Sequence, residues 1–387
     1  MRTAIKCPVH PTDEQKRQLT AEFGQVRFVW NHMLALRLRF HRMFGKWVSP
    51  LTLKKRLAVM KRRPRWAWLS QADSIALQET LRNLDKALTR AFETGAGFPK
   101  FKRRSGKQSS FHCTSLRLLG SPSENLPGNA SLRVPKLGEM RVNLHREIPD
   151  GFRLTSVTIS LSKAGRYYAS LAFDDGRSAP APPRVLRAEQ VGAGDLGVSV
   201  LMTLHTGEEI PNPRHERRND RKIRSLQREL SRKKKGSNNW DKARVLLARA
   251  HEKQADARAD HAHKISRRLI RENQAFGLED LNLRGMVKGG RGLARSLQGA
   301  GLGMIGRFCR YKAEREGRVL HEVDRFFPSS KRCNPCGYVN RDLKRGDRVW
   351  TCPCCGAVLL RDGNAASNIR DETIRELRAA GLVVLGA

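Results

Sequence analysis

Hydrophobic residues recur at helical spacing through most of the first hundred positions of the chain. A short strand is expected over residues 1–11, where prolines end the pattern. Thr12 then begins a helix, because its hydroxyl and the Gln15 side chain form the two halves of a capping box. Helical spacing continues over residues 23–40, and regularly spaced leucines give one apolar face to a second long helix, over about 70–92. The N-terminal part is therefore predicted to be mainly helical.

The pattern then changes to alternation of period two, which is typical of half-buried strands. The alternating stretches are residues 131–142 and 155–173, with a glycine turn inside the second. Residues 179–183 contain three prolines in four positions, which excludes both helix and ladder pairing. We therefore expect a first domain over residues 1–183 and a second domain over residues 184–387.

The second domain is predicted to alternate short apolar strands with helices. Three strands come first, two basic helices follow, and a strand, a helix and a strand complete the order. These elements are expected at about 190–195, 198–204, 208–210, 214–230, 240–272, 275–279, 304–316 and 319–323. A glycine-rich basic loop is expected around residues 288–295. This is an RNase H-like α/β order, so the predicted fold class is mixed, with a β module followed by an α/β domain.

Charge narrows the choice of partner. Lysine and arginine number 75 and aspartate and glutamate 37, so the net charge is +38 over 387 residues. Apolar residues make up 39% of the chain, which indicates a folded protein rather than a disordered basic tail. A polyanion is the expected partner. The N-terminus lacks an apolar signal region and no stretch reaches the roughly 20 apolar residues of a membrane span, so we expect a cytoplasmic protein with no membrane contact.

Three acidic residues stand at the ends of predicted elements in the second domain. Asp195 closes the first strand, Glu279 closes a later strand, and Asp362 opens the final helix. Phosphodiester hydrolysis with two divalent ions needs carboxylates that converge from different elements, because hard oxygen ligands must flank both ions. Strand parity favours Glu279 over Asp280, since Glu279 lies on the face opposite the apolar side chains. Each acid also has a structural interpretation, as a turn residue, a strand end or a helix cap, and spacing alone leaves both interpretations open.

Five of the eight cysteines lie between Cys333 and Cys355. Cys333 and Cys336 form one Cys-x2-Cys pair, and Cys352 and Cys355 form another, a spacing typical of four-thiolate zinc ribbons. A glycine after each pair allows the backbone to turn around a metal. Use of Cys354 as the fourth ligand would shorten the second pair to one intervening residue. Four thiolates leave no open position for water, so the predicted role is one structural zinc.

Residues 214–235 carry eleven Lys/Arg and three Asp/Glu, a local excess of eight positive charges. The apolar positions of this helix are needed for packing, so the cations are expected to point outward. A charge run of this kind fits a solvated face or a nucleic-acid backbone, and the overall charge favours the backbone. Trp66 and Trp68, which arginines flank, fit base stacking and core packing equally well.

Together these residues resemble the TnpB or OrfB-type RNA-guided nucleases of insertion sequences, which are relatives of compact type V CRISPR effectors. The resemblance covers nearly the whole chain, and its motifs follow one another in a fixed order. The matching segments are residues 11–15, 23–31, 98–102, 194–197, 231–237, 279–282, 329–333 and 361–369.

The resemblance implies a wedge-like β-barrel with a helical recognition insert at about 12–105, then a RuvC-like nuclease domain with a zinc ribbon at about 328–358. It implies that Asp195, Glu279 and Asp362 form the catalytic triad and hold two Mg²⁺ ions, beside the single Zn²⁺. The implied activity is RNA-guided cleavage of double-stranded DNA next to a short target-adjacent motif. The implied guide RNA comes from the transposon end, and the implied location is the prokaryotic nucleoid. Nucleic-acid contacts are expected at Lys100, Lys102, Arg103, Arg232, Lys233, Lys234 and Lys235.

Three positions depart from the family pattern. Gly194 replaces a commonly apolar residue, and Leu360 and Gly363 replace other neighbours of the final acid. None removes a ligand, but a glycine loosens the strand that aims Asp195. Two other functions remain as alternatives: a guide-dependent DNA-binding repressor without cleavage, which the intact triad opposes, and a transposase accessory or regulatory protein. Strand transfer would need a nucleophilic tyrosine or a separate strand-transfer site, and none of the four tyrosines lies in a histidine-pair motif.

Overall fold

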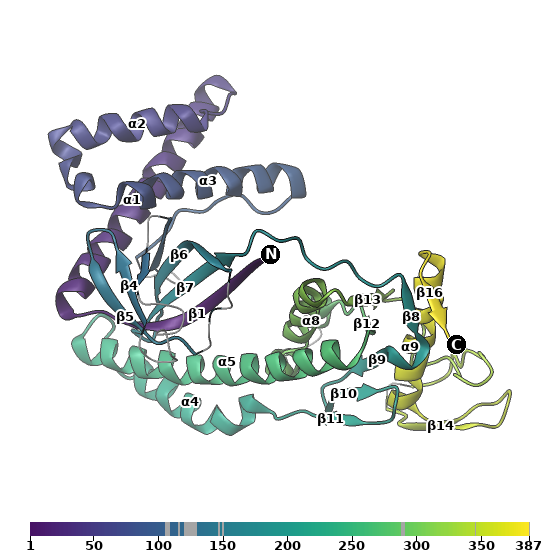
Figure 1. Cartoon of the computed structure of the whole chain (residues 1–387). Helices are drawn as coiled ribbons and strands as arrows, with labels where there is room; N and C mark the ends of the chain where they lie inside the picture. The colour runs from purple at the N-terminus through teal and green to yellow at the C-terminus, as the bar shows by residue number, and fades with distance from the viewer. Residues whose placement is uncertain are drawn as a thin grey trace. The chain divides into compact units, whose positions relative to one another are not determined.

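The structure is a computed structural model that describes residues 1–104, 109–114, 117–119, 130–145, 148, 151–287, 291–344 and 346–386. The chain forms two compact units, Met1–Arg177 and Ser178–Ala387 (Figure 1). In the described part of the chain, every helix is too short or too polar to cross a lipid bilayer.

The first unit begins with a strand and a set of helices. These are β1 (Arg2–His10), α1 (Asp13–Phe44), α2 (Pro50–Arg62), the 3₁₀ helix Pro64–Gln71 and α3 (Ser74–Thr94). The predicted capping box is confirmed, because Thr12 Oγ1 accepts a hydrogen bond from the Gln15 backbone N–H and the Gln15 side chain accepts one from the Thr12 N–H. Both predicted long helices are present. The helix α2 was missed, since Leu53, Leu57 and Met60 are its whole buried face.

A seven-stranded antiparallel sheet completes the first unit, in the order β2-β6-β7-β1-β5-β4-β3. Its other strands are β2 (Ser109–Cys113), β3 (Arg117–Leu119), β4 (Ala130–Val134), β5 (Gly138–Val142), β6 (Arg153–Leu161) and β7 (Tyr167–Asp174). The predicted alternation is confirmed as two hairpins. β1 pairs with β7 along its length but with β5 only at Val9 and His10. Within the described residues the sheet is therefore open, with β2 and β3 at its edges, where the resemblance implied a barrel.

One apolar cluster joins α1, α2, α3 and the sheet of the first unit. The Glu22 carboxyl of α1 lies inside this region and is 7% exposed. It accepts a hydrogen bond of 3.2 Å from the backbone N–H of Asp73. Burial raises the pKa of Glu22 to about 7; the hydrogen bond from the Asp73 N–H opposes the rise and the Asp73 carboxylate adds to it.

The second unit contains a five-stranded sheet in the order β11-β10-β9-β12-β13. Its strands are β9 (Val191–Leu196), β10 (Val200–Leu204), β11 (Glu209–Pro211), β12 (Ala275–Glu279) and β13 (Val319–Val323). All five agree with the predicted strands to within two residues. β12 runs parallel to both β9 and β13, while β10 is antiparallel to β9 and β11. Two small two-stranded sheets were not predicted: β8 (Val185–Arg187) with β16 (Val383–Leu385), and β14 (Val349–Thr351) with β15 (Val358–Leu360).

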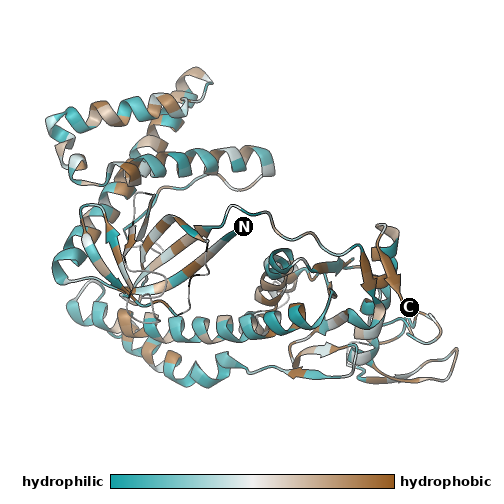
Figure 2. Ribbon diagram, viewed as in Figure 1, coloured by the Kyte–Doolittle hydropathy of each residue, from teal (hydrophilic) through white to brown (hydrophobic). Residues whose placement is uncertain are grey.

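Helices cover both faces of this sheet. They are α4 (His215–Ser231), α5 (Asn238–Glu272), α6 (Leu283–Val287), α7 (Arg291–Ala300), α8 (Leu302–Glu316) and α9 (Arg361–Ala379). α5 and α8 pack on the face that carries Phe276 and Leu278, and α9 packs on the opposite face (Figure 1). Much of α4 and α5 is hydrophilic (Figure 2), as the basic pattern predicted.

The loop expected around residues 288–295 is wrong from Arg291 onward, where α7 begins. Leu297 and Ala300, three positions apart, are buried in the core of the second unit, and this apolar spacing stabilises a helix. Residues 288–290 lie outside the described part of the chain.

Two glycines allow close packing around β9. A Cβ on Gly277 of β12 would overlap the Thr373 hydroxyl of α9, so the helix reaches the sheet only because that position is glycine. A Cβ on Gly194 of β9 would lie 2.6 Å from the sulfur of Met202 on β10. Met202 is fully buried, so its side chain fills the space that the missing Gly194 side chain leaves. The strand is packed at the point where the sequence suggested that it is loose.

The raised pKa of Glu22 predicts a pH-dependent stability. The folded state holds this proton more tightly than the unfolded state, so the contribution of Glu22 to stability is fully present below about pH 4.5 and is lost as pH rises through 7. Glu22→Gln keeps an acceptor for the Asp73 N–H and removes the ionisation. We expect the variant to exceed the wild type by about 1–3 kcal/mol at pH 8 and to match it at pH 4.5, in unfolding of the full chain. The exposed control Glu14→Gln should match the wild type at both pH values; equal stability of Glu22→Gln and wild type at pH 8 would contradict the prediction.

Candidate active site and metal centre

Three carboxylates belong to the face of the second sheet that α9 covers. Side chains two positions apart on a strand share a face, so Asp195 lies on the same side as Ala193, which packs against α9. By the same rule Glu279 lies on the side of Gly277, which α9 approaches closely. β9 and β12 are parallel neighbours, and Asp362 lies in the first turn of α9. The structure therefore brings the three predicted acids to one face and one end of the sheet.

The pKa values of two of these acids reflect their crowding. Burial and then the charge of Asp362 raise the pKa of Asp195 to about 6, although Arg361 and Arg348 oppose the rise. Burial and then the charge of Asp195 raise the pKa of Glu279 to about 7. The carboxylates are thus close enough to repel one another in a partly desolvated place. An all-oxygen donor set whose members repel one another is chemically suited to a hard divalent cation.

Arginines balance part of this negative charge. Arg348, which directly precedes β14, donates to Asp362 Oδ2 at 3.0 Å. Sequence reasoning missed Arg348, because one arginine among 75 basic residues gives no signal of its partner. Asp280 forms an ion pair with Arg325, as the parity argument predicted for a structural acid. Of the two neighbouring acids Glu279 and Asp280, Glu279 is therefore the one on the face that carries the other two carboxylates.

The four predicted cysteine ligands form a compact cluster. The Sγ atoms of Cys333, Cys336, Cys352 and Cys355 all lie within 4.8 Å of one another, so the cluster can hold a metal ion. In the described residues this is the one group of three or more His, Cys, Asp or Glu side chains whose ligand atoms lie that close together. The carboxylates of Asp195, Glu279 and Asp362 are therefore farther apart than the four thiols. The N–H of the glycine after each pair donates to the first cysteine of that pair, at 2.8 and 2.9 Å. Both glycines have positive φ, 76° and 73°. Cys354 is exposed and lies outside the cluster.

Two asparagines join the cysteine cluster to the helix that carries Asp362. Asn364 Nδ2 donates to the carbonyl of Arg332 at 2.7 Å, and Asn368 Nδ2 donates to the same carbonyl at 2.6 Å. Asn364 Oδ1 accepts from the Asn334 N–H at 2.9 Å. Both asparagines are buried, at 6% and 2% exposure. Their spacing of four residues puts them on one side of α9, a signal that sequence reasoning did not use.

The predicted nucleic-acid contacts lie at two places on the chain. Arg232, Lys234 and Lys235 are exposed in the turn after α4, and Lys233 pairs with Glu229 at 3.4 Å. Ile223 of the same helix is buried, as predicted for its apolar face. In the first unit Lys100, Lys102 and Arg103 are exposed residues of the segment that follows α3. The Lys102 ammonium lies 3.9 Å from the centroid of the Trp30 ring, so this cation also holds its own segment in place.

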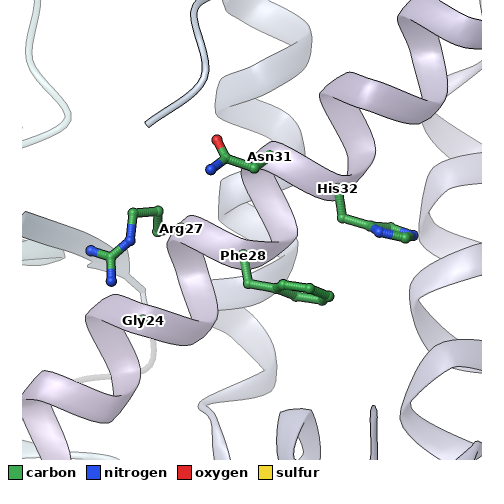
Figure 3. A pocket seen from close by; sticks show the side chains of 5 residues that line it. All are labelled: Gly24, Arg27, Phe28, Asn31 and His32. Atoms are coloured by element: carbon green, nitrogen blue, oxygen red, sulfur yellow. The ribbon is translucent and has the colours of Figure 1, made fainter. Parts of the chain in front are cut away.

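A pocket of about 440 Å³ lies on α1 of the first unit. Its lining, shown in Figure 3, is Gly24, Arg27, Phe28, Asn31 and His32. Trp68 packs edge-on against Phe28 and Trp66 edge-on against His32. The two tryptophans therefore pack against the α1 residues that line the pocket. This contact fits the core-packing interpretation of Trp66 and Trp68 better than the base-stacking interpretation. The sequence does not indicate this pocket, because its lining residues form no recognisable motif.

Three family models match parts of the chain. A model of the OrfB family, described as "Probable transposase", matches residues 177–289, and a "Cas12f1-like, TNB domain" model matches residues 303–369, which include the cysteine cluster. A "Helix-turn-helix domain" model matches residues 1–46. In the structure that segment contains β1 and the whole of the single 32-residue helix α1.

Curated relatives align over nearly the full length. A Streptomyces pristinaespiralis protein named "Putative RNA-guided DNA endonuclease" is 38% identical, over 95% of this chain and 89% of the relative. The "Putative RNA-guided DNA endonuclease InsQ" of Escherichia coli K12 is 30% identical, over 95% of this chain and 91% of the relative. A solved Cas12f1 complex with guide RNA and target DNA aligns with 96% of this chain and 98% of its own, at a TM-score of 0.49 and 11% identity.

The family models and the relatives point to the same class of protein, the transposon-associated RNA-guided nucleases. The chain belongs to the OrfB family of TnpB-type proteins, and both of these relatives carry the name "Putative RNA-guided DNA endonuclease". The resemblance that the sequence motifs indicated is thereby confirmed.

Proposed function

We propose that this chain is an RNA-guided endonuclease that cuts double-stranded DNA by metal-dependent hydrolysis beside a short target-adjacent motif. The observation that carries the proposal is the 38% identity, over nearly the whole length, to a relative that bears this name. The convergence of Asp195, Glu279 and Asp362 on one face of the sheet supports the hydrolytic part. The guide would be an RNA transcribed from the end of the transposon.

Asp195, Glu279 and Asp362 would hold the two Mg²⁺ ions. Bound divalent cations would neutralise charge on the phosphate and supply activated water. The contribution of the chain is alignment, because parallel strands fix two carboxylates and the first turn of α9 fixes the third. The charge of Asp362 adds to the rise in the pKa of Asp195, and the charge of Asp195 adds to the rise in the pKa of Glu279, so bound positive charge would relieve this repulsion.

Cys333, Cys336, Cys352 and Cys355 would hold one structural Zn²⁺, the metal typical of two Cys-x2-Cys pairs. With all four positions filled by thiolates, this metal would take no part in hydrolysis. Its contribution would be to fix the carbonyl of Arg332, which Asn364 and Asn368 of α9 both use. The zinc site would thus help to set the position of Asp362.

The RNA and DNA backbones would contact the cationic residues outside the carboxylate face. The turn after α4 offers Arg232 and the three following lysines, and the first unit offers Lys100 and Arg103. Preference for the target-adjacent motif is assigned to residues 1–183, where the pocket on α1 has polar and aromatic lining. Transplanting that segment from a relative should therefore change the preferred motif.

Purification with bound nucleic acid tests the function directly. RNA that co-purifies with the chain is sequenced and then supplied to a plasmid-cleavage assay with matching and mismatched targets. Cleavage of only the matching plasmid, dependent on Mg²⁺, is the expected result. Binding of the matching plasmid without cleavage would favour a guided repressor, and cleavage that ignores the guide would contradict the proposal.

Removal of any one acid should abolish cleavage. Asp195→Ala, Glu279→Ala and Asp362→Ala should each slow cleavage by about 1,000-fold or more, since each ligand supports several kcal/mol of charge stabilisation. Guide RNA binding should be unchanged, measured by filter binding. Asp280→Ala is the matched control, because that acid pairs with Arg325 and faces away from the site. Full activity of Glu279→Ala together with inactive Asp280→Ala would reverse the assignment.

Loss of one zinc ligand should differ from loss of the neighbouring cysteine. Cys355→Ser is expected to lower bound zinc well below one ion per chain, because it removes one of four clustered thiols. Cys354→Ser should keep the full zinc content, since Cys354 lies outside the cluster. Metal analysis of both purified variants gives the answer, and cleavage should fall only in Cys355→Ser. Zinc retained in Cys355→Ser and lost in Cys354→Ser would exchange their roles.

Neutralising the turn after α4 should weaken binding without changing specificity. Replacement of Lys233, Lys234 and Lys235 by alanine should lower affinity for all guides and targets alike. It should also flatten the plot of log affinity against log salt by about 0.7–0.9 units per lost phosphate contact. Sequence preference should be unchanged. A salt slope equal to that of the wild type would mean that these lysines face only solvent.

A further inference from the structure

Aromatic side chains gather on the first unit where the end of α1 meets the end of α3. The Trp47 ring centroid lies 5.5 Å from that of Phe92 and 6.0 Å from that of Phe98, and the two phenyl rings are 5.4 Å apart at 90°. His41 stacks on Trp47 at 4.2 Å with an interplanar angle of 10°. We call these four side chains the aromatic platform. It lies outside the apolar core of the unit, and Phe92 and Phe98 are 55% and 46% exposed.

The part of the platform that carries Phe98 is held firmly. Trp30 Nε1 donates to the carbonyl of Lys100 at 3.0 Å. The Asn31 side chain donates to the Lys102 carbonyl at 2.8 Å and accepts from the Lys102 N–H at 2.7 Å. The Lys102 ammonium covers the Trp30 ring. The backbone next to Phe98 is thus fixed to α1, so the exposed ring is presented in a set position and pays little ordering entropy on binding.

The same place is strongly cationic. Residues 39–47 and 90–104, which contain the platform, include eight lysines and arginines and a single acid, Glu93. Arg42, Lys46 and Lys100 are exposed among them. Aromatic rings surrounded by cations are complementary to a nucleic-acid strand, because such a strand carries both flat bases and phosphates. A second copy of this protein is a poorer partner, because each chain carries a net charge of +38 and the two copies would repel each other.

We propose that the aromatic platform binds unpaired nucleotides of a nucleic-acid strand. Bases stack on the exposed rings of Phe92 and Phe98, and phosphates contact Arg42, Lys46 and Lys100. Paired bases keep their π-faces inside the duplex, so the platform selects single-stranded segments without reading their sequence. The inference rests on the proposed function only in that the partner is a nucleic acid.

The test uses the full chain without added Mg²⁺ and two fluorescent oligonucleotides of about 12 units, one of thymidines and one wholly abasic. Fluorescence anisotropy gives both affinities. We expect the wild type to prefer the thymidine strand by about 5- to 100-fold, because one to two stacked bases contribute that much. Phe98→Ala and Phe98→Leu should lose most of this preference, whereas Phe98→Tyr should keep it. The salt slope should be the same in all four proteins, because no phosphate contact is removed.

Leu51→Ala is the matched control, since Leu51 of the same unit is 62% exposed and has no ring. It should keep the full preference for the thymidine strand. Circular dichroism confirms that each variant is folded. Equal affinity of the wild type for both strands, or an unchanged preference in folded Phe98→Ala, overturns the proposal. A concentration-dependent dimer of the free protein that Phe98→Ala dissociates would assign the platform to a second copy instead. Guide-dependent cleavage is measured separately, so its failure leaves this binding result standing.

Discussion

Repulsion between carboxylates is the constraint around which the second unit is organised. Asp195 and Glu279 are held beside each other by parallel strands, and burial raises their pKa values to about 6 and 7, with a further rise from the charge of Asp362 at Asp195 and from that of Asp195 at Glu279. Other contacts must hold the frame. Gly277 lets α9 reach the sheet, and Arg370 of α9 donates to the carbonyl of Val191 at 2.9 Å. The site is a locally strained charge cluster that a well-packed sheet and helix keep in place.

The cysteine cluster and the carboxylate of Asp362 are connected through α9. The thiol cluster lies at one end of a series of buried amide contacts, and Asp362 lies in the first turn of the same helix. Buried amides leave unsatisfied carbonyls when the backbone they bind shifts, so the contacts transmit order from the cluster to the helix. Arg348 adds a second connection, because it pairs with Asp362 and directly precedes the hairpin of β14 and β15 that carries the second cysteine pair.

Much of this arrangement could be predicted from local sequence, and the exceptions have physical reasons. β12, β13, the capping box at Thr12 and the cysteine pairs depend on spacing within a few residues, which a sequence displays directly. The pairing of Arg348 with Asp362 depends on how the hairpin folds back, and no local pattern encodes it. The helix that begins at Arg291 was not predicted, because the glycines of this segment indicate a loop and the helical spacing of Leu297 and Ala300 is too short to indicate a helix by itself. The order of the strands in the first sheet, β2-β6-β7-β1-β5-β4-β3 in the described residues, could not be predicted either, because strand pairing across a sheet is a long-range property.

Gly194 and Met202 occupy one shared volume across two strands. A side chain at position 194 fits only if position 202 becomes smaller, and a smaller residue at 202 opens a cavity unless position 194 gains atoms. The two positions are therefore free to change together but not separately. A relative with an apolar residue before its aspartate is expected to carry a shorter side chain opposite, so that substitutions harmless in one member of the family would disrupt another.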